Sequence, residues 1–359
     1  MGQNLAFGRL FLFPQSLHRP WFRFAGTETA ILTGSGCYHN AYTDYEKAGG
    51  TDLHDMKTQD AGYFTKLWES RQDCRLDHSQ EVWDERAQEW IDELGPDGDG
   101  KAGMRERIDH TARYLRSRGL LGEESTVIDV GCGPGLFVME FAKTARHAVG
   151  LDLSSRFVEY AEKRANAGGI KNVSFVEDDF ISLNPEDLGK LGTFDLVFTS
   201  ITPAATAKGS LEKLMKMSCG FCLNMSFVNV KDTLAERISI DVFGEKYNPR
   251  FDGSGFYALL NLLWLSGYYP ETSYYTDRRV ETVAPSEQHA SYCANLCGRF
   301  EPEDTCKTLG YLEKYGETER CSEYRYGLIL WDVRLRDVRK AIVLHSENTY
   351  TNLAASFSV

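Results

Sequence analysis

Short apolar runs alternate with segments of helical periodicity through the middle of the chain. The runs suit buried strands, because they are rich in valine, phenylalanine and leucine and are bounded by glycine or polar residues. They cover residues 127–130, 147–152, 173–176, 194–198 and 219–228. Strands that are separated by helices predict an α/β fold with a doubly wound, mostly parallel sheet.

Helical patterns also precede the first strand. Residues 81–91 place apolar and aromatic side chains on one face. A further segment repeats Met104, Ile108, Ala112 and Leu115 beneath a cluster of arginines. This spacing predicts an amphipathic helix with a solvated basic face.

After the fifth strand, helices and strands continue to alternate. Helical patterns cover residues 211–217, 232–243, 255–266, 287–296 and 303–315, and strand patterns cover residues 272–283 and 324–333. Two of these helices lie between the last two strands, so we expect a helical insert over about residues 284–315. Inserts of this length are usually functional, and we interpret this one as a substrate lid or a dimer contact.

The first apolar run ends in a turn with glycine at every second position, Val127-Ile-Asp-Val-Gly-Cys-Gly-Pro-Gly135. A tight turn after a parallel strand needs backbone angles that glycine adopts at low cost, and the missing side chains let a ligand approach the backbone. Leu136 stands where the dinucleotide fingerprint requires glycine or alanine, which argues against that class of site. Asp152 ends the second strand, where a carboxylate is placed to accept hydrogen bonds from ribose hydroxyls.

With Asp129 two residues before the first glycine, this turn resembles motif I of the class I methyltransferases that depend on S-adenosylmethionine (SAM). The resemblance extends over about residues 105–230 and implies a Rossmann-like sheet of seven strands that ends in an antiparallel hairpin. It implies SAM as the cofactor and S-adenosylhomocysteine (SAH) as the product. The residues that the resemblance assigns to SAM are Asp129, Gly131, Cys132, Gly133, Gly135, Asp152, Leu153, Asp179, Phe180 and Ser200.

The same resemblance gives some of these residues separate roles. Asp179 is expected to face the adenine amino group, and the backbone amide of Phe180 to face a ring nitrogen. Asp178 is the alternative if the register is shifted by one residue. Ser200, at the end of the fourth strand, is expected to border the methyl group.

The family resembled has no universal catalytic residue, because SAM already carries an excellent electrophile and alignment is the main task of the enzyme. We therefore assign no catalytic group, and His110 and His289 stay open as alternative bases. Ser200 and Thr202 are candidate positioning groups, and Tyr63 and Trp68 are candidate walls of the acceptor pocket.

The expectations divide the chain into four parts. Residues 1–50 are predicted to be a poorly ordered extension, because aromatic residues and arginines occur there without a period. Residues 51–118 form an expected N-terminal helical cap, and residues 119–335 an expected SAM-binding domain. Residues 336–359 are predicted to be a loose tail.

Composition narrows the functional classes. The chain has 359 residues and a formal net charge of −12, which argues against a protein that follows a nucleic-acid backbone. No apolar run reaches the roughly 20 residues that a membrane-spanning helix needs, and no convincing signal peptide begins the chain, so we expect a cytoplasmic protein. Nine cysteines occur, but Cys293, Cys297, Cys306 and Cys321 lack the spacing of structural zinc sites, and no metal site is expected.

The methyl acceptor stays open in the sequence. The segment Ser200-Ile-Thr-Pro203 lacks the Asp/Asn-Pro-Pro-Tyr/Phe motif of enzymes that methylate base amino groups in DNA, which favours a small-molecule acceptor at oxygen, nitrogen, sulfur or carbon. The alternatives are a protein or tRNA methyltransferase, and a non-catalytic SAM-binding sensor or subunit. A thiol or metalloid methylase that uses Cys293 and Cys297 is a further alternative.

Overall fold

The computed structural model describes residues 53–70, 79–94, 102–248 and 251–337. The expected extension over residues 1–50, the glycine-rich turn at residues 95–100 and the part of the expected tail beyond residue 337 lie outside these ranges. Within the described ranges, no helix combines the length and apolar character needed to cross a membrane.

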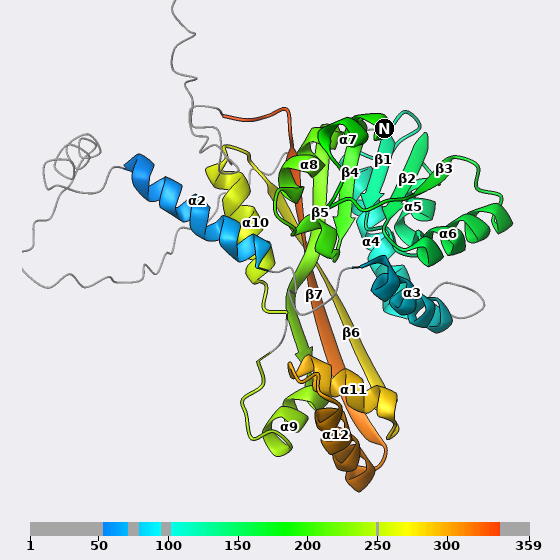
Figure 1. Ribbon diagram of the computed structural model, residues 1–359, viewed down its shortest axis with the longest axis vertical. Coiled ribbons are helices and arrows are strands. Elements are labelled where there is room, and N and C mark those ends of the chain that lie inside the picture. The colour runs from blue at the N-terminus through cyan, green and yellow to red at the C-terminus, as the bar shows by residue number, and fades with distance from the viewer. Residues whose placement is uncertain (1–52, 71–78, 95–101, 249–250, 338–359) are drawn as a thin grey trace, which may run out of the picture. The chain divides into compact units, whose positions relative to one another are not determined.

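A single seven-stranded sheet organises the described chain (Figure 1), in the order β3-β2-β1-β4-β5-β7-β6. The strands are β1 (Thr126–Val130), β2 (His147–Asp152), β3 (Val173–Glu177), β4 (Phe194–Ser200), β5 (Ser218–Asp232), β6 (Glu271–Val283) and β7 (Thr318–Asp332). The first five strands run parallel, and β7 is antiparallel to both β5 and β6. This topology confirms the predicted Rossmann-like sheet and its terminal hairpin.

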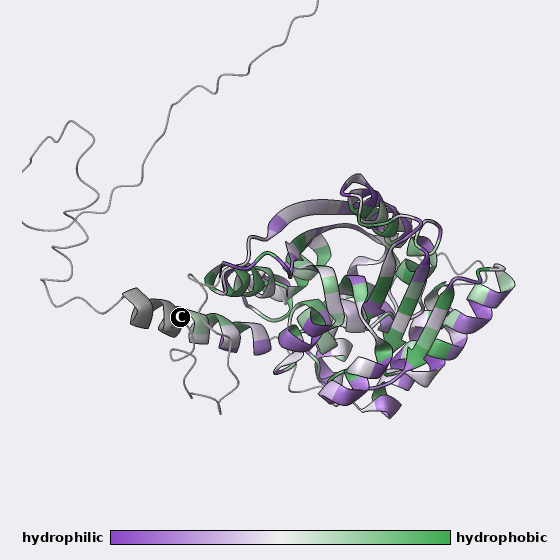
Figure 2. Ribbon diagram, turned by 90° about the horizontal axis from the view of Figure 1, so that it is seen from above, coloured by the Kyte–Doolittle hydropathy of each residue, from purple (hydrophilic) through white to green (hydrophobic). Residues whose placement is uncertain are grey.

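Helices cover both faces of the sheet. They are α2 (Leu53–Glu69), α3 (Gln80–Leu94), α4 (Ala102–Ser117), α5 (Leu136–Phe141), α6 (Ser155–Ala167), α7 (Pro185–Leu191), α8 (Ser210–Met217), α9 (Thr233–Asp241), α10 (Ser254–Leu265), α11 (Glu287–Leu296) and α12 (Pro302–Tyr315), with a short 3-10 turn, η1 (Pro203–Ala205). Val127 belongs to the core beneath α4 and α5, whereas its neighbour Ile128 belongs to the core beneath α8 and α10. Because both faces are buried, the central strands are apolar throughout, and Figure 2 shows apolar residues gathered in the strands.

The last three strands continue beyond the end of β4. Ser200 of β4 pairs with Met225, and from there to Asp232 β5 pairs with β7. The far end of these strands carries α9, α11 and α12, which share a separate small core that includes Leu234, Val283 and Leu312. We call this end the distal lobe. The expected helices of the insert are present, but β5 and β7 are longer than the sequence patterns indicated.

The amphipathic helix predicted at the basic cluster is present as α4, and Arg105, Arg113 and Arg118 are exposed as expected. Two arginines of the cluster also form ion pairs with a buried acid. Glu140 of α5 is buried, and its carboxylate lies 3.0 Å from both Arg105 Nη2 and Arg116 Nη2 and 2.6 Å from Lys143 Nζ. A buried carboxylate is costly unless it is paired, so α4 and α5 need these cations to pack together.

Candidate functional site

The glycine turn, residues 131–135, is fixed to the end of β2 by its backbone. The amides of Gly131 and Cys132 both donate to the Leu151 carbonyl, at 2.7 and 3.1 Å. Gly131, Gly133 and Gly135 all have positive φ, at 74°, 53° and 72°. This left-handed conformation is the reason that glycine alternates through the turn.

The three glycines differ in what surrounds them. A Cβ atom on Gly131 would lie 2.2 Å from Thr202 Oγ1, and one on Gly135 would lie 2.6 Å from Phe175 Cε1. The fold itself therefore demands glycine at these two positions. A Cβ on Gly133 would meet no heavy atom within 4 Å. The backbone at Gly133 is thus open to a ligand, as a cofactor cradle requires.

Asp152 is oriented by the turn and by the next helix. Its Oδ2 atom accepts from the Gly133 amide at 2.7 Å, and its Oδ1 atom accepts from the Ser154 amide at 3.0 Å. Burial raises the pKa of Asp152, and these amides act in the opposite direction. Ser154 caps α6 by accepting from the Phe157 amide. The carboxylate keeps lone pairs for the ribose hydroxyls that the sequence assigned to it.

Asp129 lies buried one residue before the end of β1, and its Oδ1 atom has no hydrogen-bond partner in the described chain. Burial, and then the charge of Asp152, raises the pKa of Asp129 well above its ordinary value. A buried acceptor without a partner is costly and calls for an explanation. A bound group that donates hydrogen bonds at the glycine turn supplies one, so Asp129 and Gly133 together fit the cofactor implied by the sequence.

The raised pKa of Asp129 predicts a pH-dependent stability. The unfolded chain releases this proton at about pH 4, before the folded protein does, so the carboxyl group lowers the free energy of unfolding as pH rises above that value. We expect Asp129→Asn to raise the free energy of unfolding at pH 7 by about 1 kcal/mol or more, and to have little effect near pH 3.5. Urea unfolding of the cofactor-free protein at both pH values measures this difference.

Asp195→Asn is the matched control for this prediction. Burial acts to raise the pKa of Asp195, but hydrogen bonds from the Thr126 amide and hydroxyl, both at 2.8 Å, lower it overall. Its contribution to stability is therefore present at neutral pH and is lost as pH falls, so Asp195→Asn should destabilise at pH 7. A gain at Asp129→Asn that is equal at both pH values would contradict the argument.

Asp84 is a residue of this site that the sequence did not reveal. It lies on α3 and accepts from Ser154 Oγ at 2.6 Å, Ser155 Oγ at 3.0 Å and the Arg156 amide at 3.3 Å. These contacts attach α3 to the start of α6, directly beside Asp152. No local motif marks Asp84, because its partners are about seventy residues away in the chain.

The backbone after β4 is strained where the reacting methyl group is expected. Ile201 has a φ of 54°, which is the sole positive φ of a non-glycine residue in the described ranges. Its amide donates to the Met225 carbonyl at 3.0 Å, and the Thr202 hydroxyl accepts from the Ala204 amide. Strain of this kind persists where the surrounding structure imposes it and is often found at functional sites. No sequence pattern predicts this conformation at Ile201, because β-branched residues seldom adopt it.

The two residues assigned to adenine lie just after β3. Asp179 uses its carboxylate locally, accepting from the Ile181 amide at 3.0 Å and from Ser182 Oγ. The Phe180 side chain is buried. Asp178 accepts from the Asp179 amide at 2.8 Å. Both acids shape the same turn, so the choice of register stays a prediction.

The candidate acceptor residues and bases come from several elements. Tyr63 and Trp68 belong to α2, which packs against α10, where Tyr63 is exposed and Trp68 is buried in the core. The His110 ring lies 4.8 Å from the Tyr275 ring with 31° between the planes, and His289 contacts Ser286 at the start of α11. Thr202 lies next to the glycine turn, because an added Cβ atom on Gly131 would be 2.2 Å from its Oγ1.

The described ranges contain no cluster of three or more His, Cys, Asp or Glu side chains that could hold a metal ion. Burial raises the pKa of the Cys293 thiol to about 12 and that of Cys297 to about 11. Thiols that stay protonated at neutral pH are poor nucleophiles and poor metal ligands. The raised pKa values of Cys293 and Cys297 argue against the thiol or metalloid chemistry considered for them.

Comparisons with known proteins point to one family. Residues 121–234 match a family model described as a methyltransferase domain. The human EEF1A lysine methyltransferase 2 is 25% identical over 192 residues, which cover 49% of this chain and 80% of that protein. The 23S rRNA (uracil(1939)-C(5))-methyltransferase RlmD of Vesicomyosocius okutanii is 31% identical over 134 residues, or 30% of each chain. The match therefore spans less than a third of the length of the rRNA methyltransferase.

Among solved structures, the magnesium protoporphyrin IX methyltransferase of Synechocystis PCC 6803 with bound SAH is 14% identical, with a TM-score of 0.41 over 70% of this chain and 96% of that one. The family match covers both sides of the glycine turn, including Asp129, Asp152 and the strained end of β4. Residues 121–234 therefore match a methyltransferase domain, in agreement with the class I SAM-dependent family that the glycine turn resembles.

Proposed function

We propose that the chain is a SAM-dependent methyltransferase that transfers the methyl group to a small-molecule acceptor by in-line displacement. The observation that carries this proposal is the arrangement at the carboxyl ends of β1 and β2. There an open backbone at Gly133, an oriented Asp152 and the unpartnered Oδ1 atom of Asp129 meet. In open α/β sheets, ligands bind at this edge.

Each residue has a defined task in the proposed mechanism. Bound SAM supplies a methyl group that its sulfonium makes electrophilic. Asp152 holds the ribose, and Asp129 accepts a hydrogen bond from the part of the cofactor that lies over the glycine turn. Ser200, Ile201 and Thr202 border the reacting group, where they orient the acceptor and exclude water. Leu153, Asp179 and Phe180 remain assigned to the adenosine side.

A small-molecule acceptor is favoured by the net charge of −12 and by the segment Ser200-Ile-Thr-Pro203. A protein or RNA acceptor is the second candidate, because the relatives include a lysine methyltransferase and an rRNA methyltransferase. The distal lobe would then be the surface that grips the larger substrate. A non-catalytic SAM-binding subunit is the third candidate, and a lid or homodimer role of the insert is compatible with each of them.

Calorimetric titration with SAM, SAH and NAD tests the cofactor assignment. We expect micromolar binding of the two adenosyl ligands and no binding of NAD. Asp152→Ala should weaken SAH binding by about tenfold or more, because hydrogen bonds to a charged group contribute about 1.5–3 kcal/mol. Asp187→Ala, on the exposed helix α7, is the control and should bind SAH normally. The proposal fails if neither adenosyl ligand binds, or if Asp152→Ala binds SAH as tightly as the parent.

A further inference from the structure

An aromatic surface begins where the SAM site ends. We define it by Phe227 of β5, Tyr275 of β6, Tyr324 and Tyr326 of β7, and Phe251. The ring of Phe227 lies 4.4 Å from that of Phe251 and 5.1 Å from that of Tyr326, and Tyr275 stacks on Tyr326 at 6.0 Å with 17° between the planes. Most of these rings are only partly buried, so the surface is accessible.

The position of this surface relates it to the proposed reaction. The Ile201 amide, at the strained end of β4, donates to the Met225 carbonyl. Phe227 follows Met225 by two residues, so both side chains lie on the same face of β5. Ile201 packs against the same core as Phe227 and Tyr326. The aromatic surface therefore extends from the place where the methyl group is expected toward the distal lobe.

Arg107 of α4 lies over this surface without an acid to neutralise it. Its guanidinium carbon is 5.0 Å from the centre of the Tyr326 ring, and one terminal nitrogen lies 2.7 Å from the Met104 sulfur. Its Nε atom is buried with no hydrogen-bond partner, and no carboxylate of the described residues pairs with Arg107. Arg279 beside it differs, because Asp277 holds it in an ion pair at 2.5 Å.

The start of α4 is held close to the sheet, which fixes the place of Arg107. A Cβ atom on Gly103 would lie 2.0 Å from Asp277 Oδ2 and 2.2 Å from Arg279 Nη2. Glycine at position 103 therefore lets the first turn of α4 approach β6 closely. Arg107, one turn further along α4, is presented to the aromatic rings by this contact.

We propose that the aromatic surface binds the methyl acceptor and that Arg107 binds its anionic group, so that the acceptor is a small aromatic carboxylic acid; this inference rests on the proposed function. Flat rings offer offset-stacked or edge contacts to an aromatic body. A guanidinium presents a planar fork that matches a carboxylate. Because the chain is acidic overall, an anionic substrate needs such a local cation.

The test uses two probes of one shape, 2-naphthoate and the neutral 2-naphthalenemethanol, titrated by fluorescence into full-length protein saturated with SAH. We expect the acid to bind at least tenfold more tightly than the alcohol. Arg107→Met should abolish this preference and leave the weak binding of the alcohol unchanged. Arg113→Met, an exposed arginine on the same helix, should keep the full preference. Phe227→Leu should weaken both probes to a similar extent.

The outcomes separate the two proposals. SAH binding without a preference for the acid, or a preference that survives Arg107→Met, overturns the inference and leaves the proposed cofactor intact. Unchanged binding of both probes by Phe227→Leu also overturns it, because the rings would then only pack on one another. Tighter binding of 2-naphthyl phosphate than of 2-naphthoate would replace the carboxylate by a phosphate and contradict the stated class. Failure to bind SAH would remove the proposed function and the inference together.

Discussion

Replacing Arg320 by leucine is expected to lower the free energy of unfolding by about 3–5 kcal/mol, the usual cost of leaving one charge of a buried pair alone. Arg320 Nε lies 2.6 Å from Asp232 Oδ2, and the two side chains are 7% and 0% exposed. The other oxygen of Asp232 caps α9 by accepting from the Leu234 and Ala235 amides. The carboxylate is therefore unable to leave its place when its cation is removed.

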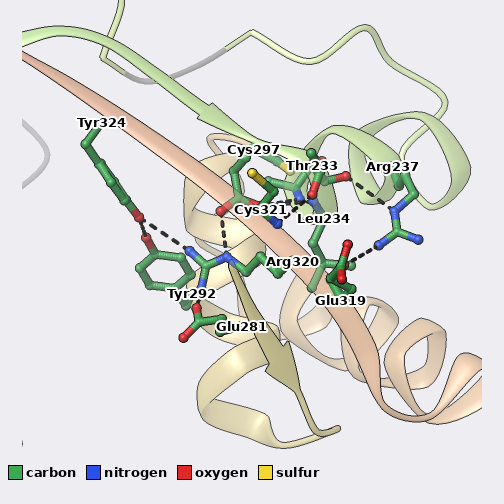
Figure 3. A network of polar contacts seen from close by, with 12 residues as sticks. Thr233, Leu234, Arg237, Glu281, Tyr292, Cys297, Glu319, Arg320, Cys321 and Tyr324 are labelled. Carbon is green, nitrogen blue, oxygen red and sulfur yellow. Dashed lines mark hydrogen bonds and ion pairs between the residues drawn. The ribbon is translucent and has the colours of Figure 1, made fainter. Parts of the chain in front are cut away.

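Arg320 has further partners besides Asp232, so its replacement should lower the free energy of unfolding by more than the loss of one isolated ion pair would. Figure 3 shows its guanidinium between Glu281, Tyr292 and Tyr324. It lies 2.9 Å from Glu281 Oε1 and 4.4 Å from the centre of the Tyr292 ring. These contacts join β6, β7, α9 and α11, so the Arg320 side chain stabilises the packing of these elements in the distal lobe.

Urea unfolding followed by circular dichroism measures this loss. Arg325→Leu is the matched control, because Arg325 lies on the same strand, is half exposed and is 3.9 Å from Glu323. Exposed ion pairs contribute little, so we expect a change of less than about 1 kcal/mol in the control. SAH affinity should stay unchanged in both variants while they are folded. A loss at Arg320→Leu no greater than that of the control would show that Asp232 is solvated.

Arg320 and Asp232 also show why part of the fold escaped prediction. The four strands from β1 to β4 follow short apolar runs, and the structure places them within about two residues of the predicted ranges. The ends of β5 and β7 carry Asp232 and Arg320, which the sequence patterns place outside the strands, because charged side chains are seldom buried. They are buried here because each finds a partner in another element. Hydrophobic patterns in a sequence indicate which residues are buried. They do not indicate which charged residues pair with each other in the fold.

The same distinction applies to the site. The glycine turn and Asp152 were predictable, because the conformations and spacing that they need are local. Asp84 and Ile201 were not, because their roles come from Ser154 and Met225 in other elements. Tyr63 and Trp68 were assigned to the pocket because the N-terminal helices were expected to cover the cofactor cleft. The structure packs their helix, α2, against α10, and their role in the pocket stays a prediction. The aromatic surface on β5, β6 and β7 appears only when the long strands are paired.

Replacing Gly133 by alanine is expected to weaken SAH binding by up to about 100-fold while the protein stays folded. An added methyl group at this position meets no atom of the protein within 4 Å, so it enters the space that the proposed cofactor needs. Overpacking in a fitted site costs up to about 3 kcal/mol, which corresponds to roughly 100-fold in affinity. Calorimetric titration with SAH, combined with thermal unfolding of the same sample, measures both effects.

Gly119→Ala separates the backbone strain from the block to binding. Gly119 has a φ of 70° and, like Gly133, no atom within 4 Å of an added Cβ, but it lies in the turn between α4 and β1. Both variants should lose about 1–2 kcal/mol of stability, because a side chain strains a left-handed residue. SAH affinity should fall in Gly133→Ala alone. Equal affinities in the two variants would mean that the space above Gly133 is not where the cofactor binds, and the assignment of the glycine turn would have to be withdrawn.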